Sequence, residues 1–405
     1  MTIRVLYLSS APKIGGSTKS LSEAFKAFPD GAVEGVIICP KGEVTDVYSS
    51  IGMTVISVPG ISRWNETDHG YYRGLRWGIL LREIYYFPFT IWGVLKARRM
   101  ARFDIIHAND VDLAYVGGIA KRLLHAPLLV HVRCVLRKFD ASARTKHLNK
   151  FLRVGADRVI SIDQTVRRTL GNDVVSDIIH NGLNVDRSVN CDRNSETGPL
   201  RIAFVGGFTL MKGILEFAEA AKLCRDRGMN VQFVAAGENA RAAKGVLGRL
   251  LSLANLSHDV AGELAAMIER YDLQGTLLLK GFIRNVSSIY ANVDVLCFAS
   301  HLDAPGRPVF EAAYFEVPSI VAVRCPTADT IVPGETGICI SKADPVLIAD
   351  AIEFLYKNPE ERRRMGRNAR KLAETNFDIR ANAARLLEIY REMAFKAAKK
   401  LAAKS

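Results

Sequence analysis

The stretch HLDAPGRPVFEAAYFEVPSIVAV, residues 301–323, decides the fold that the sequence predicts. An apolar run before it, Val293–Phe298, and a second one at its end, Ser319–Val323, are typical of buried strands. Pro308 suits the first position of a helix between them, because its missing N–H would have no intrahelical partner there. The stretch therefore predicts a strand, a loop, a helix and a second strand.

The loop and the helix start combine features of phosphate binding and of diol binding. The amides of Val309 and Phe310 would point freely out of the helix N-terminus, which attracts anions. Asp303 stands on the loop and Glu311 about a turn into the helix, and carboxylates accept hydrogen bonds from hydroxyls such as those of ribose or a hexose. These features favour a nucleotide-sugar site. The alternative, a strand-loop-helix unit whose Glu311 merely favours a helix N-terminus, stays open.

This pattern resembles the Glu-x7-Glu signature of the family 4 retaining glycosyltransferases, which have the GT-B fold of two facing Rossmann-like domains. The matching residues are Asp303, Gly306, Pro308, Glu311, Ala312 and Pro318. The resemblance implies that Glu311 binds the ribose, Asp303 the donor hexose, and the amides after Gly306 the diphosphate. Because Asp303 replaces the family's Glu and is shorter by about 1.5 Å, the identity of the donor sugar stays open.

Apolar runs that are mostly β-branched recur along the chain, with helical stretches between them. The predicted strands are Arg4–Ser9, Val36–Cys39, Thr54–Val58, Asp104–His107, Leu128–His131, Arg158–Ser161, Asp177–His180, Arg201–Val205, Val231–Ala236 and Leu277–Lys280, besides the two already named. This alternation predicts an α/β protein with doubly wound parallel sheets, whose ligand crevices lie at the carboxyl ends of the strands.

A polar segment, Cys191–Pro199, predicts the linker between two domains. Residues 1–190 would form an N-terminal, acceptor-side domain, and residues 198–375 would bind the nucleotide sugar. Residues 376–405 would form a helix that returns toward the N-terminal domain, as the resemblance implies. The segment Ala240–Tyr271 is longer than the family pattern requires and predicts an additional helix.

Two further matches fall in the N-terminal half. Gly15 and Gly16 follow the first strand without the motif of a dinucleotide site or a P-loop. In the resembled family this Gly-Gly turn approaches the donor phosphates and the acceptor; a tight strand-helix turn is the alternative. His131 matches the histidine of the family's Val-x-His motif, which reaches the donor sugar across the cleft; a buried structural histidine is the alternative.

The remaining matches fall in the C-terminal half. Lys212 matches the lysine of the family's Gly-Arg-x4-Lys-Gly loop, in which Gly207 replaces the arginine. Lys212 would pair with the diphosphate, although a lone loop lysine is usually only solvated. Gly281 and Phe282 stand where the nucleotide base stacks in the family. Arg307, beside the helix start, is the candidate cation that replaces the missing arginine, unless it points to solvent.

Composition and charge narrow the class of protein. The 405 residues suffice for two domains, and the net charge of +13 is uneven, because residues 1–195 carry 27 of the 55 Lys and Arg residues but only 18 of the 42 Asp and Glu residues. No nucleic-acid-binding motif is present, so no nucleic-acid partner is expected. The 7 cysteines lack CxxC spacing and indicate buried free thiols in a reducing compartment.

The sequence predicts a cytoplasmic protein without a membrane-spanning segment, because no apolar run reaches about 18 residues and the N-terminus leads directly into a strand. Arg63–Arg102 nevertheless mixes aromatic with basic residues and contains all 3 tryptophans. Such a mixture suits peripheral binding to an anionic membrane. A buried helix with a solvated basic end is the alternative, and Pro88 interrupts any ideal amphipathic helix.

Together these features predict a retaining hexosyltransferase that uses a nucleotide diphosphate sugar, UDP- more often than GDP-linked in this family, and a lipid-linked or polysaccharide acceptor. We expect no cofactor and no metal, on the interpretation that no Asp-x-Asp metal motif follows a predicted strand. A nucleotide-sugar 2-epimerase of the same fold is the rival enzyme. A degenerate, non-catalytic binding module is the other alternative, which the departures at Gly207 and Asp303 keep open.

Overall fold

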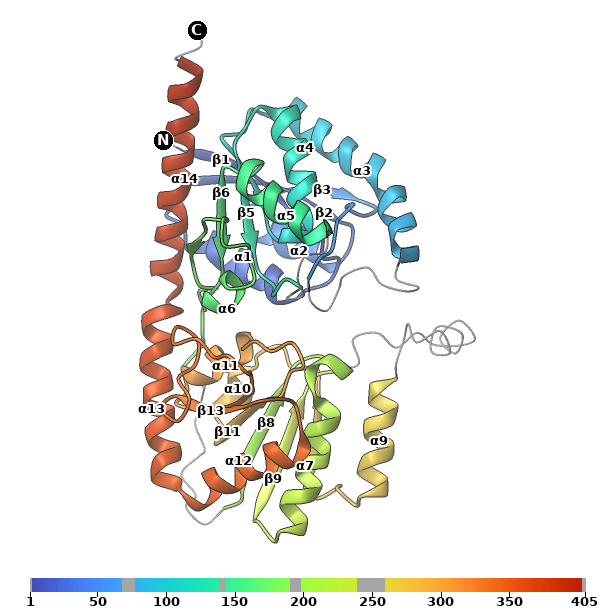
Figure 1. Ribbon diagram of the computed structural model, residues 1–405, viewed down its shortest axis with the longest axis vertical. Helices are drawn as coiled ribbons and strands as arrows, with labels where there is room; N and C mark the ends of the chain where they lie inside the picture. The colour runs from blue at the N-terminus through green and yellow to red at the C-terminus, as the bar shows by residue number, and fades with distance from the viewer. Residues whose placement is uncertain (1, 68–76, 138–142, 190–197, 239–258, 403–405) are drawn as a thin grey trace. The chain divides into compact units, whose positions relative to one another are not determined.

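The computed structural model describes residues 2–67, 77–137, 143–189, 198–238 and 259–402 (Figure 1). The chain divides into two compact units, one formed by Met1–Asn184 with Asn376–Ser405 and the other by Val185–Thr375. Each unit is built on one sheet of parallel strands, so the predicted α/β class with two doubly wound sheets is confirmed. Cys191 and most of the predicted linker lie outside the described residues.

The sheet of the first unit has the order β3-β2-β1-β4-β5-β6-β7, and every neighbouring pair is parallel. Its strands are β1 (Ile3–Leu8), β2 (Val33–Pro40), β3 (Thr54–Val58), β4 (Ile105–Ala108), β5 (Leu128–Val132), β6 (Arg158–Ser161) and β7 (Asp177–Ile178). The central strands are buried on both faces, which explains their continuous apolar runs.

Helices cover both faces of this sheet. One face packs on α1 (Gly16–Lys26), α2 (Glu43–Ser50) and α14 (Ile379–Ala402), which share a core with β1, β2, β4 and β5. The remaining helices are α3 (Ile79–Met100), a 3₁₀ turn η2 (Val111–Leu113), α4 (Ala114–Leu124), α5 (Ala143–Val154) and α6 (Gln164–Arg167). On α14, the Tyr390 hydroxyl lies 2.5 Å from His107 Nδ1 and 3.3 Å from the Tyr7 hydroxyl, so the last helix is bonded to the strands it covers.

The sheet of the second unit has the order β10-β9-β8-β11-β12-β13, again all parallel. Its strands are β8 (Leu200–Val205), β9 (Val231–Ala236), β10 (Leu277–Gly281), β11 (Val295–Phe298), β12 (Ser319–Ala322) and β13 (Gly337–Ile340). The carboxyl ends of parallel strands meet at one edge of a sheet, so the loops that leave β8 to β12 on that edge are neighbours.

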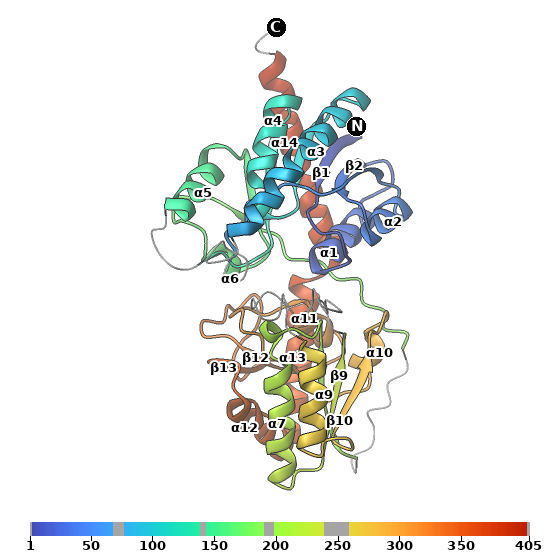
Figure 2. The same ribbon diagram turned by 90° about the vertical axis from the view of Figure 1, so that its right-hand side faces the viewer.

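The second unit's main core lies between this sheet and three helices, α7 (Ile214–Asp226), α9 (Val260–Arg270) and α12 (Pro345–Lys357) (Figure 2). Its other elements are η3 (Leu210–Lys212), α10 (Ser287–Tyr290), α11 (Arg307–Ala313) and α13 (Pro359–Asn376). Helix α9 confirms the additional helix predicted within Ala240–Tyr271, whereas residues 239–258 lie outside the described residues. In the part of the chain that the structure describes, no helix is long and apolar enough to cross a membrane.

The prediction of buried free cysteines is confirmed at Cys39, Cys224 and Cys297, where burial raises the pKa of each thiol to about 12. It is wrong at Cys325, which is exposed because it follows β12 on a loop rather than within a strand.

Candidate functional site

Three backbone loops meet at the carboxyl edge of the second sheet. A Cβ atom at Gly237, after β9, would lie 1.9 Å from the carbonyl oxygen of Gly206, after β8, so only glycine fits there. The Gly237 N–H donates to the carbonyl of Gly281, the last residue of β10, at 2.9 Å. The exposed Gly207 and the predicted base-stacking residues Gly281 and Phe282 therefore belong to one cluster of loops, in which Phe282 is 67% exposed.

Lys212 lies beside the start of α11. Its Nζ is 5.2 Å from the centre of the Phe298 ring, at the end of β11, which is within range for a cation–π interaction. The same ring meets Gly306, the N-cap of α11, because a Cβ there would lie 2.5 Å from Phe298 Cζ. Lys212 and the turn at Gly306 therefore both lie against the Phe298 ring.

Glu311 is buried and holds two partners. The Tyr290 hydroxyl donates to its Oε2 at 3.0 Å, and Arg307 Nε donates to its Oε1 at 2.6 Å. Burial, together with the charge of Glu311, raises the pKa of Tyr290, so this hydroxyl keeps its proton and remains a donor. The site therefore presents a fixed carboxylate, and each of its oxygens has a second lone pair with which to accept from a ligand hydroxyl.

The structure corrects one alternative for Arg307. The side chain does not point to solvent, because it is only 14% exposed and forms an ion pair with Glu311 one turn further along α11. Its role as the replacement for the arginine missing at Gly207 stays a prediction.

The first turn of α11 also differs from the expectation of free amides. The Val309 N–H already donates to the Gly306 carbonyl at 2.9 Å, because the turn closes with a short-range bond before the regular helix begins. Pro308 occupies the second rather than the first helical position. The side chains of Val309 and Phe310 are buried.

Asp303 binds Arg324, a residue that sequence reasoning missed. One oxygen of Asp303 accepts from the Arg324 backbone N–H at 2.7 Å, and the other accepts from its Nε and Nη2 at 3.1 and 2.9 Å. Asp303 has a left-handed backbone with φ of 52°, which turns the loop toward β12. Arg324 is the first charged residue after the predicted strand Ser319–Val323, and that position was the available signal. Since its side chain is 63% exposed, Arg324 adds a cation to this edge.

Gly15 and Gly16 lie in the first unit, at the start of α1. Gly15 is the N-cap with an extended backbone, and Gly16 is the first helical residue. A Cβ added at either would meet nothing within 4 Å, and neither has a left-handed φ. The fold itself therefore has no steric or conformational need for glycine at these two positions.

We predict that Gly16→Ala leaves the thermal unfolding midpoint unchanged or slightly raised, because alanine restricts the unfolded chain more than glycine does. If a substrate approaches this turn closely, the added methyl lowers kcat/KM by about tenfold or more, since small misplacements are costly in transfer reactions. Calorimetric melting and steady-state kinetics check the two halves. If the folded variant kept normal turnover, Gly15 and Gly16 would form only a tight strand-helix turn without a substrate contact.

His131 is the penultimate residue of β5, and its side chain is buried in the first unit. It is stacked on His107 with ring centres 5.4 Å apart, and it is 3% exposed. Neither of its ring nitrogens has a hydrogen-bond partner among the described residues. Burial first, and then the charge of Arg133, lowers the pKa of both histidines well below the usual value. His131 is therefore a neutral, incompletely bonded imidazole in this state.

This pair predicts a pH-dependent stability. Because the folded chain holds His131 neutral, the unfolded chain binds an additional proton below about pH 6.5, and the free energy of unfolding falls as the pH drops. Relative to His131→Gln, the parent should lose up to about 1.4 kcal/mol per pH unit between pH 6.5 and 5.5 in urea denaturation. The comparison with the variant matters, since the raised pKa of Asp112 acts in the opposite direction. If the difference in the free energy of unfolding between the parent and His131→Gln stayed constant over this pH range, the prediction would be wrong. It would also be wrong if the difference between the parent and the control His125→Asn, which removes an exposed histidine, changed by the same amount.

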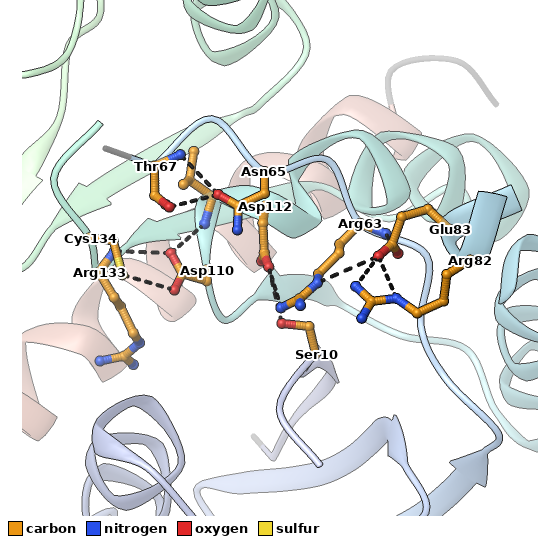
Figure 3. A network of polar contacts seen from close by, with 11 residues as sticks. Ser10, Arg63, Asn65, Thr67, Arg82, Glu83, Asp110, Asp112, Arg133 and Cys134 are labelled. Atoms are coloured by element: carbon orange, nitrogen blue, oxygen red, sulfur yellow. Dashed lines mark hydrogen bonds and ion pairs between the residues drawn. The ribbon is translucent and has the colours of Figure 1, made fainter. Parts of the chain in front are cut away.

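A polar network in the first unit escaped the sequence prediction (Figure 3). Asp112 Oδ2 accepts from Ser10 Oγ at 3.2 Å and lies 3.4 Å from Arg63 Nη1. Asp110 caps η2 through the Val111 N–H at 2.7 Å, and its other oxygen accepts from Cys134 Sγ at 3.5 Å. Burial is the largest cause that raises the pKa of Asp112 to about 7, and the negative charge of Asp110 is the second. The network therefore holds a buried carboxyl group with a raised pKa, beside the loop that leads from β1 to Gly15.

This network corrects the interpretation that no Asp-x-Asp sequence follows a strand, because Asp110-Val111-Asp112 comes two residues after the end of β4. The signal was present in the sequence and was missed. Over residues 2–67, 77–137, 143–189, 198–238 and 259–402, no group of three or more His, Cys, Asp or Glu side chains is arranged to hold a metal ion. That the protein needs no metal stays a prediction.

Comparison with known families covers both units. The family described as "Glycosyltransferase Family 4" matches residues 14–187, and the family described as "Glycosyl transferases group 1" matches residues 191–372.

Two relatives illustrate the range of similarity. The chain is 28% identical over 176 residues to the capsular polysaccharide biosynthesis glycosyltransferase CapM of Staphylococcus aureus, which covers 44% of this chain and 42% of that protein. It is 24% identical over 389 residues to a D-inositol 3-phosphate glycosyltransferase of Corynebacterium diphtheriae, and this match covers 87% of this chain and 83% of that protein. The match thus spans less than half of the first relative and most of the second.

Solved structures share the fold over nearly the whole chain. Anabaena HepE in complex with UDP and glucose has a TM-score of 0.72 at 18% identity, over 96% of this chain and 99% of that one. Sucrose-phosphate synthase of Thermosynechococcus elongatus has a TM-score of 0.74 at 18% identity, over 96% and 99% of the two chains. At these identities the likeness concerns the fold.

Proposed function

Because the chain belongs to the family 4 glycosyltransferases and has the GT-B fold, we propose that it transfers a hexosyl unit, with retention, from a nucleotide diphosphate sugar to a glycan acceptor. The proposed donor is a UDP-sugar, with a GDP-sugar second. Three similar structures of Anabaena HepE contain UDP or UDP-glucose and support this choice.

The observation that carries the proposal is the arrangement around α11. Lys212 lies over the ring of Phe298 against which α11 begins, and the buried Glu311 stands one turn into that helix. A nucleoside diphosphate needs a cation for its phosphates and an acceptor for its ribose hydroxyls. Lys212 and Glu311 supply these two groups on neighbouring elements of one sheet edge.

The proposed reaction needs no protein base. The acceptor hydroxyl oxygen bonds to the anomeric carbon on the face from which the bond to the diphosphate oxygen breaks, and that phosphate oxygen takes the hydroxyl proton. Lys212 stabilises the charge that develops on the leaving diphosphate. Asp303 would hold the donor hexose, and His131 would contribute to the sugar site. The Ser10, Arg63 and Asp112 network would bind hydroxyls of the acceptor, because it combines donors and acceptors at the carboxyl ends of β1 and β4.

The proposed acceptor is lipid-linked or a growing polysaccharide of the cell surface. The similarity to a capsular polysaccharide glycosyltransferase supports this acceptor class. A lipid-linked acceptor would place the reaction at the cytoplasmic, inner face of a membrane.

The proposal has two rivals. A 2-epimerase of the same fold would bind the same donor and transfer to no acceptor. A degenerate, non-catalytic module is the other, and the glycine at position 207 and the aspartate at position 303 keep it open.

Incubation of the purified protein with UDP-, GDP- and ADP-hexoses, followed by proton NMR, tests the proposal. We expect slow release of free hexose from one donor class, with the configuration of the donor in the first product. Formation of an epimer at C2 would show the epimerase. No product and no nucleotide binding would show the non-catalytic module. Inversion in the first product would contradict retention.

A further inference from the structure

Helix α3 has a buried inner face and an exposed outer face. Its inner face, formed by Glu83, Thr90, Gly93, Val94 and Ala97, is buried in the first unit. A Cβ at Gly93 would lie 3.1 Å from Ile38 and 3.3 Å from Val58, so this face packs closely on β2 and β3. The inner residues recur at helical spacing, and they account for one side of the helix.

The opposite side of α3 carries an exposed apolar stripe, which we call the outer stripe. It consists of Leu81, Ile84, Tyr85, Trp92 and Leu95, which are 72%, 62%, 62%, 51% and 37% exposed. The spacing of three, four or seven residues places them on one face, directly opposite the inner residues. Pro88 falls on the same stripe, and Trp77, just before α3, is 46% exposed. Figure 1 shows α3 along one side of the first unit.

The charges around the outer stripe have one sign. Arg82, Lys96, Arg98 and Arg99 are exposed, whereas the helix's single acid, Glu83, is 3% exposed and bonded to Arg82 at 2.5 Å. Lys96 Nζ also lies 5.1 Å from the centre of the Trp92 ring. The stripe thus combines apolar and aromatic side chains with a border of cations.

We propose that the outer stripe is a docking surface for an anionic lipid bilayer, on which α3 lies parallel to the membrane plane. A contiguous row of large apolar side chains on a protein surface commonly marks an interaction site, and the outer side of α3 carries such a row. Aromatic rings and aliphatic side chains enter the boundary between headgroups and acyl chains, while bordering Lys and Arg residues meet anionic headgroups. The charge argues against a second copy of the chain, because a symmetric dimer through this stripe would bring like cations together.

This surface extends beyond the proposed transfer reaction and does not depend on it. The stripe belongs to the first unit, whereas Glu311 and Lys212 belong to the second, and the exposed side chains of the stripe all come from α3. Vesicle binding can therefore be measured without any donor or acceptor.

The test is co-sedimentation of the full chain with vesicles of phosphatidylcholine, with and without about one third phosphatidylglycerol. We expect binding to the anionic vesicles, weaker binding to the neutral ones, and a decrease as added salt shortens the Debye length from about 10 Å at 0.1 M to about 3 Å at 1 M. The double variant Tyr85→Ser, Trp92→Ser should lower the partition coefficient tenfold or more. The triple variant Lys96→Ser, Arg98→Ser, Arg99→Ser should lower it by about a hundredfold, since each cation near the surface contributes roughly 1 kcal/mol, a factor of about five.

Matched controls remove the same kinds of side chain elsewhere. Val346→Ser with Phe354→Ser takes two exposed apolar side chains from α12, and Arg363→Ser with Arg367→Ser and Lys371→Ser takes three exposed cations from α13. Both controls should bind like the parent, and circular dichroism should show all variants folded. No binding by the parent, equal binding by the α3 variants, or equal losses in the controls would overturn the proposal. So would light scattering that shows a lipid-free dimer abolished by Tyr85→Ser, Trp92→Ser, because a second copy would then cover the stripe.

Discussion

Lys212→Met is expected to lower kcat by about two to three orders of magnitude, with a much smaller change in KM. Removing one preorganised group that stabilises developing charge typically has this effect on turnover, roughly 2.7–4 kcal/mol. The structure supports this role, because Lys212 ends η3 beside the ring on which α11 begins. Steady-state kinetics with the preferred donor measures the change, and Lys212→Arg should recover part of the loss by restoring the charge.

Lys222 is the matched control for Lys212. It lies on α7 in the same unit and bonds Asp226 one turn away at 2.6 Å, as surface lysines commonly do. Lys222→Met should keep kcat within about twofold of the parent. If Lys212→Met also kept normal turnover, the leaving diphosphate would not be stabilised by this lysine.

Glu311→Gln is expected to weaken the binding of free UDP by about 10- to 100-fold. A ribose diol would lose a charged acceptor, and hydrogen bonds to charged groups contribute roughly 1.5–3 kcal/mol. Asp303→Asn should bind free UDP like the parent and lose turnover, because its proposed partner is the hexose. Titration calorimetry with UDP and kinetics with the UDP-sugar separate the two carboxylates. Normal UDP binding by Glu311→Gln would exclude the ribose role.

The ion pair between Glu311 and Arg307 could produce the same loss indirectly, so a double-mutant cycle belongs with this prediction. If Glu311 binds the ribose and Arg307 the diphosphate, each single variant should weaken UDP binding and the double variant should weaken it further. Equal losses in both single variants and in the double variant would instead assign the effect to the pair as a unit. Tyr290→Phe serves as a further control, because it removes the other partner of Glu311 without removing charge.

Much of the fold was predictable because the strands are buried on both faces. Runs such as Val295–Phe298 are apolar and buried at every position, and parallel sheets in α/β proteins favour this pattern. The ends were less certain, as at β5, which continues through Val132 past the predicted end at His131. Strand ends depend on pairing with β4 and β6, which local sequence does not encode.

The positions of the candidate site residues in the fold were predictable where these residues follow strand ends. Their bonding partners were unpredictable where the partners are distant in sequence. Asp303 follows β11, Lys212 follows β8, and Glu311 lies one turn into α11, as their motifs indicated. The bonds of Asp303 to Arg324 and of Glu311 to Tyr290 join residues 21 positions apart, which only the folded chain brings together. The burial of Arg307 likewise depends on tertiary packing.

The most direct test of the central claim is a crystal structure of the parent protein with UDP. We predict the nucleotide at the carboxyl edge of the second sheet, with ribose hydroxyls within hydrogen-bond distance of the Glu311 carboxylate and the diphosphate beside Lys212 Nζ. UDP bound elsewhere, or no UDP at millimolar concentration in crystals that leave this edge accessible, would contradict the account.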